Sequence, residues 1–390
     1  MSRSGSQLRT LSGLLGHLRP HWRRDSGLPS RIEALLRGDR RLGSRDRRLY
    51  RELIYTALRY LPWVEPLLDG APEEALRRIA WLAADTAATR AFREEVARGL
   101  PACPPGVDER ASLLGADPAA LSPGWLASEC PEALRRPLRD VLLGRAPLWV
   151  RVQREEEAVR EEFGRLGWSV RPSPWVVGAF ELPVDADVAR SEAYRLGRVE
   201  VQDAGSQRVL ASLGIEPGGH WLNACAGAGG KTLQLASLLG GSGRVSARDL
   251  RPAALEELRV RAERAGLGER IEIGSQVDPQ GGFDGILVDA PCSGSGTWRR
   301  APHLRWTTTP GSIARAASLQ ASLLREAAQR VRRGGRLVYA TCSLCESENE
   351  AVRSAFLAAE GSLEPDGPGA RLMPDQHDGD GFYVASFRKP

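Results

Sequence analysis

Apolar residues in the first part of the chain are spaced as in helices. Between Ser44 and Leu61 they recur at every fourth position from Leu49 onward, so the pattern predicts a helix with Ser44 as its N-cap. Proline and glycine punctuate residues 100–125, which predicts connections between helices. We therefore assign residues 1–145 to an all-α N-terminal domain.

The pattern changes after this region. Residues 148–152 alternate as in a strand, residues 153–166 have helical spacing, and residues 168–170 and 176–182 are short apolar runs that predict two further strands. We therefore expect a small α+β module over residues 146–198.

From Val199 onward, strand and helix patterns alternate. The predicted strands are 220–226, 244–249, 270–273, 283–289 and 336–341, and the predicted helices are 252–265 and 313–331. Gly334 and Gly335 are placed to cap the last helix. This β-α-β-α order predicts an α/β domain over residues 199–390, with a mostly parallel sheet and helices on both faces.

Composition supports a folded chain without membrane spans. The 390 residues are 42% apolar and 26% charged, which is close to the globular average and excludes disorder as the main state. No apolar run reaches 18 residues, so we expect no membrane-spanning helix. Six cysteines are too few for a disulfide scaffold, and with no secretory signal they point to the reducing cytoplasm.

Positive charge is concentrated near the N-terminus. Residues 1–60 hold 14 Arg against 5 Asp plus Glu, a balance of +9, whereas the whole chain has +5 and the remainder therefore −4. Such a basic region suits a polyanionic partner and favours nucleic acid. Arg45, Arg47 and Arg48 are candidates for phosphate contacts, although an exposed helix face explains them equally well.

A glycine-rich loop follows the first predicted strand of the C-terminal domain. A phosphate-binding P-loop would need glycine where Cys225 stands, and a dinucleotide loop would need glycine where Thr232 stands. S-adenosylmethionine has no phosphate and needs a carboxylate for its ribose; Asp249 lies 22 residues beyond Gly227, near the end of the second strand. The candidate cofactor-binding residues of the loop are Cys225, Ala226, Gly227, Gly229, Gly230 and Lys231.

Two cysteines follow two successive strands. Asp289 and Cys292 come after residues 283–289, and Cys342 comes after residues 336–341. Because ligands bind at the carboxyl ends of parallel strands, we expect these side chains to converge with the glycine loop. Cys345 makes a Cys-x-x-Cys pair with Cys342, but no second close pair accompanies it, so we expect no metal.

Two thiols, a carboxylate and S-adenosylmethionine suit methylation of a pyrimidine at C5. That carbon is a poor nucleophile until a thiolate adds at C6 and makes it enamine-like. A carboxyl group can hold the ring at N3, and a second group must assist when the C5 proton and the thiol leave.

The chain resembles the RNA (cytosine-5) methyltransferases of the RsmB/Fmu type over residues 145–390. The similar segments are VQDAGSQ (201–207), ACAGAGGKT (224–232), VDAPCSGSGTWRR (288–300), LVYATCS (337–343) and ENE (348–350). Residues 1–140 are similar to the helical antitermination-factor-like RNA-binding domain of some members. The resemblance implies a Rossmann-like class I methyltransferase domain, a ferredoxin- or RRM-like module before it, and structured RNA, in particular ribosomal RNA, as the substrate.

The resemblance also implies roles for individual residues. Cys342 would attack C6 of cytosine, Cys292 would assist product release, and Asp289 would contact the cytosine ring and the cofactor. The loop 225–231 would hold the methionine part of S-adenosylmethionine, and Asp249 its ribose. Candidate RNA contacts after the Pro-Cys segment are Arg299, Arg300, His303 and Arg305, with Trp298 and Trp306 stacking on bases or packing inside the protein.

The sequence departs from the family pattern at the cofactor loop. Asn223 stands where the family usually has Asp, and Gly227-Ala228 where it has Ala-Pro. The strand 271–276 lacks the usual acid, for which Ser275 or Gln276 could substitute. Both cysteines remain, so we expect an active enzyme, and because the sequence has no heptad pattern we expect a monomer. Two alternatives stay open: a non-catalytic RNA-binding or ribosome-assembly factor that kept the fold, and a P-loop nucleotide-binding protein.

Overall fold

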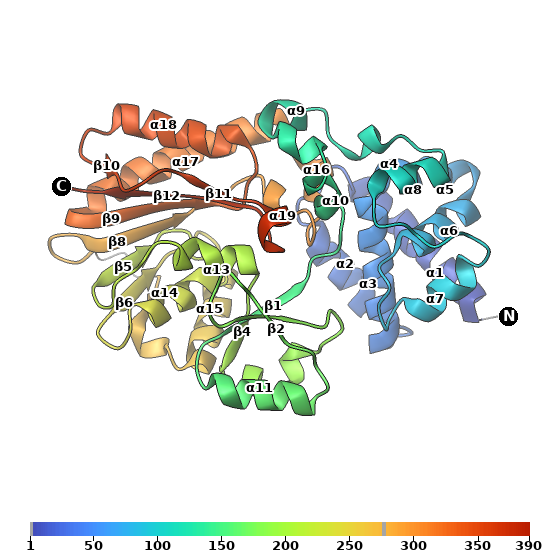
Figure 1. The fold of residues 1–390 in the computed structure, drawn as a ribbon, viewed down its shortest axis with the longest axis horizontal. Coiled ribbons are helices and arrows are strands. Elements are labelled where there is room, and N and C mark those ends of the chain that lie inside the picture. The colour runs from blue at the N-terminus through green and yellow to red at the C-terminus, as the bar shows by residue number, and fades with distance from the viewer. Residues whose placement is uncertain (1–2, 275–277) are drawn as a thin grey trace. The chain divides into compact units, whose positions relative to one another are not determined.

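The computed structural model describes residues 3–274 and 278–390 (Figure 1). These residues form two compact units. The first, which we call the helical unit, comprises Met1–Arg145 and Thr297–Thr309. The second, which we call the sheet unit, comprises Ala146–Gly296 and Pro310–Pro390.

The helical unit is built around one apolar core. Its helices are α1 (Arg3–Leu18), α2 (Leu28–Gly38), α3 (Ser44–Arg59), α4 (Leu61–Val64), α5 (Leu67–Gly70), α6 (Pro72–Leu82), α7 (Arg90–Val96), α8 (Val107–Leu114), α9 (Leu126–Glu129), α10 (Leu138–Leu142) and α16 (Leu304–Thr307). Helix α3 buries Leu49 and Leu53 as its spacing predicts. The prediction that Ser44 caps it is wrong, because Gly43 is the N-cap and Ser44 is the first helical residue.

The segment Thr297–Thr309 packs inside the helical unit, although the sequence places it within the C-terminal domain. Trp298 is buried and meets Trp125 edge-on, with 5.9 Å between the ring centroids. The indole of Trp306 donates to the carbonyl of Leu58 at 2.6 Å. The helical unit is therefore completed by a piece of chain that begins only five residues after Cys292.

The sheet unit contains a small antiparallel sheet of order β2-β3-β1-β4. Its elements are β1 (Leu148–Val152), α11 (Glu156–Arg165), β2 (Arg171–Pro172), β3 (Ala179–Leu182), α12 (Glu192–Arg195) and β4 (Val199–Val201). The strand predicted over residues 168–170 is absent from this described region, and the pairing of β2 begins instead at Arg171.

A larger sheet has the order β10-β12-β9-β8-β5-β6-β7, with β11 paired to β12. Its strands are β5 (His220–Asn223), β6 (Arg244–Ala247), β7 (Ile271–Ile273), β8 (Phe283–Asp289), β9 (Val331–Thr341), β10 (Glu364–Pro365), β11 (Ala370–Leu372) and β12 (Phe382–Arg388). Strands β5 to β9 pair in parallel, and β12 pairs antiparallel with β9 and β10. The predicted α/β fold is thus confirmed, with a mixed, mostly parallel sheet.

Helices cover both faces of the large sheet. Figure 1 shows α17 (Pro310–Arg330) and α18 (Glu350–Ala359) on one face, and α13 (Ala204–Ala211), α14 (Gly230–Leu238) and α15 (Pro252–Ala265) on the other. A short helix, α19 (Pro374–His377), precedes β12. Each face has its own buried apolar cluster, with Leu324 and Phe356 in one and Leu233 and Leu258 in the other.

The junction between α17 and β9 differs from the prediction. The helix ends at Arg330 and the strand begins at Val331, so the predicted glycine cap is wrong. Gly334 lies within β9, where its φ of +75° and its hydrogen bond to the carbonyl of Lys389 accompany a register shift against β8. Among the described residues, no helix combines the length and apolar character needed to cross a bilayer.

Truncation of Trp298 should loosen the helical unit. Trp298→Ala removes a buried indole, a change that costs about 3–5 kcal/mol. We expect faster amide hydrogen exchange in α9 and α16, which carry or adjoin the Trp125 and Arg305 side chains that contact this ring, measured by mass spectrometry. Leu250→Ala, at a fully exposed side chain of the sheet unit, is the control and should leave exchange unchanged. Equal exchange in the two variants would contradict the packing described here.

Candidate functional site

The parallel strands end at one edge of the large sheet. Asn223 of β5 pairs with Ala247 of β6 and with Leu287 of β8, and Asp289 of β8 pairs with Ala340 of β9. The glycine loop, Asp249, Asp289, Cys292 and Cys342 all follow these strand ends, so the structure gathers them at one edge, as the alternation of strands and helices predicts.

The glycine loop turns tightly into α14. Gly227 and Gly229 have φ values of +54° and +90°, a backbone region that side chains rarely adopt. A Cβ atom at Gly229 would also lie 2.2 Å from a methyl carbon of Leu258. Gly230 is the first residue of α14, and Cys225 and Ala226 lead into the turn. The loop therefore brings bare backbone to the edge where Asp249 lies.

Asp249 is held by hydrogen bonds from two backbone N–H groups and one guanidinium. It accepts from the backbone N–H of Gly227 at 2.8 Å, and from the backbone N–H and guanidinium of Arg251 at 2.9 Å each. Burial alone would raise the pKa of this carboxyl, but the Arg251 and Gly227 hydrogen bonds outweigh it and lower the pKa. Asp249 is thus an ionised acceptor at neutral pH, covered by a mostly exposed arginine side chain.

Lys231 does not face the loop as a free cation. Its ammonium lies 3.0 Å from Oδ2 of Asp289 and 4.5 Å from the centroid of the Phe382 ring. In a phosphate loop this lysine would reach a phosphate. Here its charge is already committed to Asp289, which favours a ligand without phosphates.

Asn223 has a structural role that an aspartate could not fill in the same way. The side chain is fully buried; its amide donates to the hydroxyl of Thr232 at 3.0 Å and its oxygen accepts from the N–H of Cys225 at 3.4 Å. An amide can donate and accept, whereas a carboxylate only accepts. This departure from the family pattern is therefore matched to the Thr232 hydroxyl.

The two cysteines of the strand ends are in contact. Sγ of Cys292 lies 3.4 Å from Sγ of Cys342. The hydrogen bond with Cys342, burial and the nearby carboxylate of Glu348 raise the pKa of the Cys292 thiol well above its ordinary value. Cys292 therefore keeps its proton at neutral pH.

Glu348 ties the two cysteine-bearing loops together, and we assigned it no role from the sequence. One carboxylate oxygen accepts from the N–H of Ser293 at 2.7 Å, and the other from the hydroxyl of Ser343 at 2.6 Å. The side chain is fully buried, and Gln320 donates to it at 3.3 Å. The signal available in the sequence was an acid six residues after Cys342, which alone does not reveal its partners.

The other thiols near this edge are poor nucleophiles. Burial and the charges of Asp289 and Asp249 raise the pKa of Cys225 to about 12. Burial raises the pKa of Cys345 to about 11. Cys345 contacts the hydroxyls of Ser293 and Ser295 at 3.6 Å. The described residues contain no group of three or more His, Cys, Asp or Glu that could hold a metal ion.

Three of the four predicted RNA contacts after Cys292 are buried inside the helical unit. Arg299 donates to the carbonyl of Arg145 at 3.0 Å, and Arg305 donates to the carbonyls of Leu121 and Leu142 at 3.2 Å each. Burial and the charge of the neighbouring Arg59 lower the pKa of Arg305 to about 9.

His303 is the third of these buried residues. It interacts with the carbonyl of Ser26 at 3.1 Å, and burial lowers its pKa. Arg300 alone of the four is exposed. The structure therefore gives Arg299, His303 and Arg305 internal partners and does not place them on a phosphate-binding surface.

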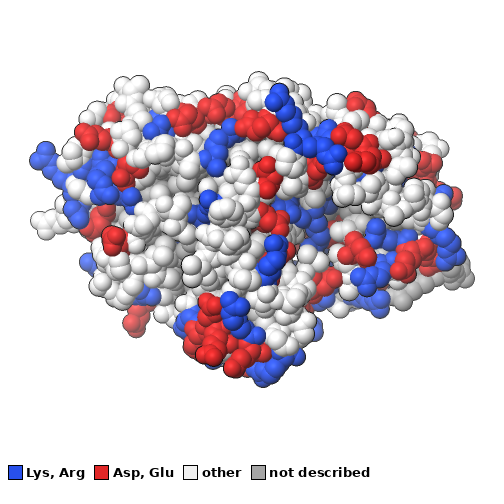
Figure 2. Space-filling view, in the orientation of Figure 1, with Lys and Arg blue, Asp and Glu red and all other residues white. Residues whose placement is uncertain are grey.

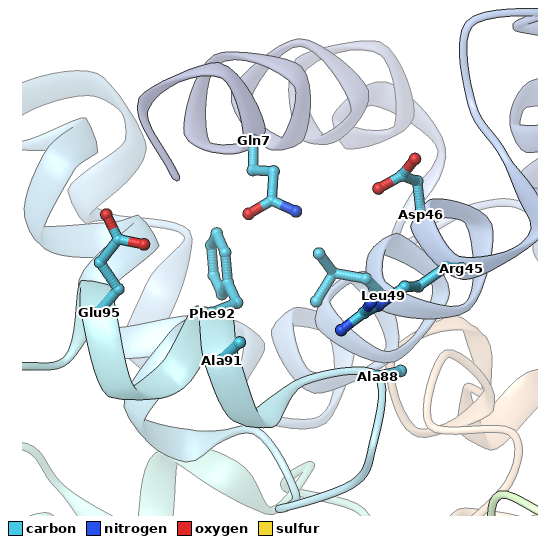
Figure 3. A pocket seen from close by; sticks show the side chains of 8 residues that line it. All are labelled: Gln7, Arg45, Asp46, Leu49, Ala88, Ala91, Phe92 and Glu95. Carbon is cyan, nitrogen blue, oxygen red and sulfur yellow. The ribbon is translucent and has the colours of Figure 1, made fainter. Parts of the chain in front are cut away.

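The three N-terminal candidate arginines differ in exposure. Arg45 and Arg48 are exposed and Arg47 is partly buried. Arg45 lines a small cavity of about 60 Å³ between α1, α3 and α7 (Figure 3). The carboxylates of Asp46 and Glu95 line the same cavity, so acids outnumber the single arginine there.

Basic and acidic side chains are also interspersed on the face drawn in Figure 2. One further prediction, Ser275 as a cofactor contact, lies outside the described residues.

Comparison with known proteins identifies the family to which this chain is similar. The model of the 16S rRNA methyltransferase RsmB/F family matches residues 210–388. Ribosomal RNA small subunit methyltransferase B of Salmonella arizonae is 33% identical over 293 residues, covering 70% of this chain and 67% of that protein. The protein of the same name from Escherichia coli is 31% identical over 299 residues, covering 72% and 69%.

Solved structures show the same fold. The crystal structure of PH0851 covers 100% of this chain and 99% of its own, with a TM-score of 0.76 and 21% identity. A methyltransferase homolog protein from Pyrococcus horikoshii covers 74% of this chain and 100% of its own, with a TM-score of 0.60 and 25% identity.

Removal of the Glu348 carboxylate should destabilise the two loops. Glu348→Ala leaves the Ser293 N–H and the Ser343 hydroxyl without their buried acceptor, at a cost of about 1–3 kcal/mol for each unsatisfied group. Glu348→Gln keeps one acceptor oxygen and should lose less. Urea unfolding followed by circular dichroism measures the difference, with the exposed Glu346→Ala as control. The bridging role would be refuted if Ala at 348 cost no more than Ala at 346.

Proposed function

The chain belongs to the RsmB/F family of 16S rRNA methyltransferases, and on that premise we propose that it methylates C5 of a cytosine in 16S rRNA through a covalent adduct with Cys342. The enzyme class is that of S-adenosylmethionine-dependent rRNA (cytosine-5) methyltransferases. The observation that carries the covalent route is the contact of 3.4 Å between the sulfurs of Cys292 and Cys342, beside the Lys231–Asp289 pair.

The residues at the sheet edge fit S-adenosylmethionine. The loop from Cys225 to Lys231 offers close backbone approach, and its lysine is neutralised by Asp289. Asp249 is an ionised acceptor suited to two ribose hydroxyls, which would replace the exposed guanidinium of Arg251. When bound, the cofactor supplies a methyl group on a positively charged sulfonium.

We assign the attack on C6 to Cys342. Its thiolate would form the S–C6 bond, which gives C5 the electron density to accept a methyl group. The adduct resolves when a water molecule takes the C5 proton, the C–H electron pair re-forms the C5–C6 double bond, and the S–C6 bond breaks to return the Cys342 thiolate. Cys292 is a poor nucleophile because it stays protonated. Its sulfur is nevertheless close enough to exchange a proton with the departing Cys342 thiolate.

Asp289 would hold the cytosine ring. Its carboxyl lies at the end of β8, three residues before Cys292, and Lys231 fixes one of its oxygens at 3.0 Å. The other oxygen remains available to accept from the exocyclic amine of the base, and from N3 when that nitrogen carries a proton in the C6 adduct. Because bases in a helix are hidden, the target cytosine has to be unpaired or flipped out.

Substitution of the two cysteines tests the assignment of roles. With labelled S-adenosylmethionine and an unmodified 16S rRNA transcript, Cys342→Ala should lose about 1,000-fold or more of the transfer rate. Cys292→Ala should accumulate a covalent protein–RNA band on a denaturing gel. Cys103→Ser, a thiol of the helical unit, is the control. A wild-type protein that binds the transcript but transfers no methyl group would favour the assembly-factor alternative.

Substitution of Asp249 tests the cofactor site. Loss of a charged acceptor costs about 1.5–3 kcal/mol, so Asp249→Ala should weaken S-adenosylmethionine binding about 10- to 150-fold by calorimetry. Glu216→Ala, an exposed acid that precedes β5, should bind normally. Normal affinity in Asp249→Ala, or a thermal shift with ATP and none with S-adenosylmethionine, would contradict the assignment.

A further inference from the structure

A tryptophan lies exposed at the tip of the small sheet, between β2 and β3. The side chain of Trp175 is 51% exposed, and that of Val177 beside it is 99% exposed. The hydroxyl of Ser173 accepts from the N–H groups of Trp175 and Val176 at 3.1 and 3.3 Å, and Gly178 turns the chain with a φ of +76°. The tip is therefore a fixed turn that presents an aromatic ring to solvent.

An arginine without a carboxylate partner stacks on this ring. The guanidinium carbon of Arg208, on α13, lies 4.8 Å from the centroid of Trp175. Its polar contact is to the ring of His377, at 3.0 Å from Nε2, and no Asp or Glu among the described residues forms an ion pair with it. Burial and the charge of Arg208 lower the pKa of His377 to about 4, so the histidine is neutral at pH 7. The positive charge of Arg208 is thus uncompensated.

The cluster lies towards the catalytic edge of the sheet unit. His377 ends α19, and the N–H of Gly381, four residues later, donates to the carbonyl of Gly296 at 2.8 Å. The N–H of Gly296 in turn donates to the carbonyl of Cys342 at 3.0 Å. Tyr383 of β12 pairs with Thr341, the residue before Cys342. A short chain of hydrogen bonds therefore links the turn after α19 to the loops that carry both cysteines.

We propose that Trp175 and Arg208 bind single-stranded RNA next to the target cytosine, with a base stacked on the exposed part of the Trp175 ring, which Arg208 and His377 contact from the protein side, and a phosphate on Arg208. An exposed, fixed aromatic ring beside an unpaired arginine is the combination by which proteins hold unpaired nucleotides. This inference rests on the proposed function, and it extends the substrate site from the flipped base to its neighbours. It also places RNA contacts in the sheet unit, in contrast to the predicted contacts Arg299, His303 and Arg305, which are buried in the helical unit.

Binding of an unmodified 16S rRNA transcript tests the site. Stacking on an aromatic side chain contributes about 1–3 kcal/mol, so Trp175→Ala should raise the Kd and KM about 5- to 150-fold with little change in kcat. Trp175→Phe should recover most of the loss, because the smaller ring still stacks. Arg208→Gln should reduce the slope of log K against log salt concentration by about one.

Leu166→Ala, at an exposed apolar residue of the same module, is the matched control. An unchanged Kd in Trp175→Ala would overturn the proposal. So would a loss of RNA affinity that Trp175→Phe does not recover and that is accompanied by a lower urea midpoint of unfolding, because the ring would then only stabilise the turn. The outcome is separable from that of the proposed function. If the enzyme transfers methyl groups but its Kd for RNA does not depend on Trp175, only the proposed RNA site is refuted. If RNA binding depends on Trp175 but no methyl group is transferred, only the proposed reaction is refuted.

Discussion

The parallel pairing of β8 with β9 is the constraint on which the site depends. Because Asp289 is in register with Ala340, the two strands end together, and the loops that follow them must run side by side. Two loops that leave adjacent strands could still diverge. The buried carboxylate of Glu348 prevents this, since it accepts a hydrogen bond from the residue after Cys292 and another from the residue after Cys342. The sulfur–sulfur contact is thus a consequence of strand register and of one shared acceptor.

The acidic residues at this edge of the sheet also raise the pKa values of its thiols. Glu348 contributes to the raised pKa of Cys292, and Asp289 and Asp249 to that of Cys225, in each case with burial. An acid-rich edge holds these thiols protonated, which is unfavourable for attack but useful for a group that must carry a proton. It also suits a cationic sulfonium better than a phosphate. The acids that organise the site therefore act on its ligand preference as well as on its geometry.

The sequence predicted the parallel strands and helices of the α/β domain well, but not the last strand of the sheet or the partners of the buried arginines. The strand 283–289 and the helix 252–265 have the predicted bounds, because the apolar run of the first and the helical periodicity of the second each indicate a single type of element. The pairing of β12 with β9 was not predicted, since an antiparallel partner that arrives forty residues later leaves no local signal. Arginines 299 and 305 resembled phosphate contacts because their actual partners are backbone carbonyls, which every sequence contains. Whether an arginine is buried against backbone carbonyls depends on the tertiary fold, and the order of residues in the sequence does not reveal it.

The positions of the charged side chains say more about how this chain attracts RNA than its net charge does. The excess of arginine in residues 1–60 is partly balanced by acids of the same unit, as in the pairs of Arg19 with Asp69 and Arg23 with Glu65. A paired arginine attracts a polyanion weakly, because the nearby carboxylate cancels much of its field. Net attraction for RNA then comes from the few cations without such partners, and the rest of the affinity has to come from contacts that do not depend on charge. Under the proposed function, we expect a chain built in this way to recognise RNA by unpaired bases and shape more than by phosphate density, because selection of one cytosine in a folded RNA requires such contacts.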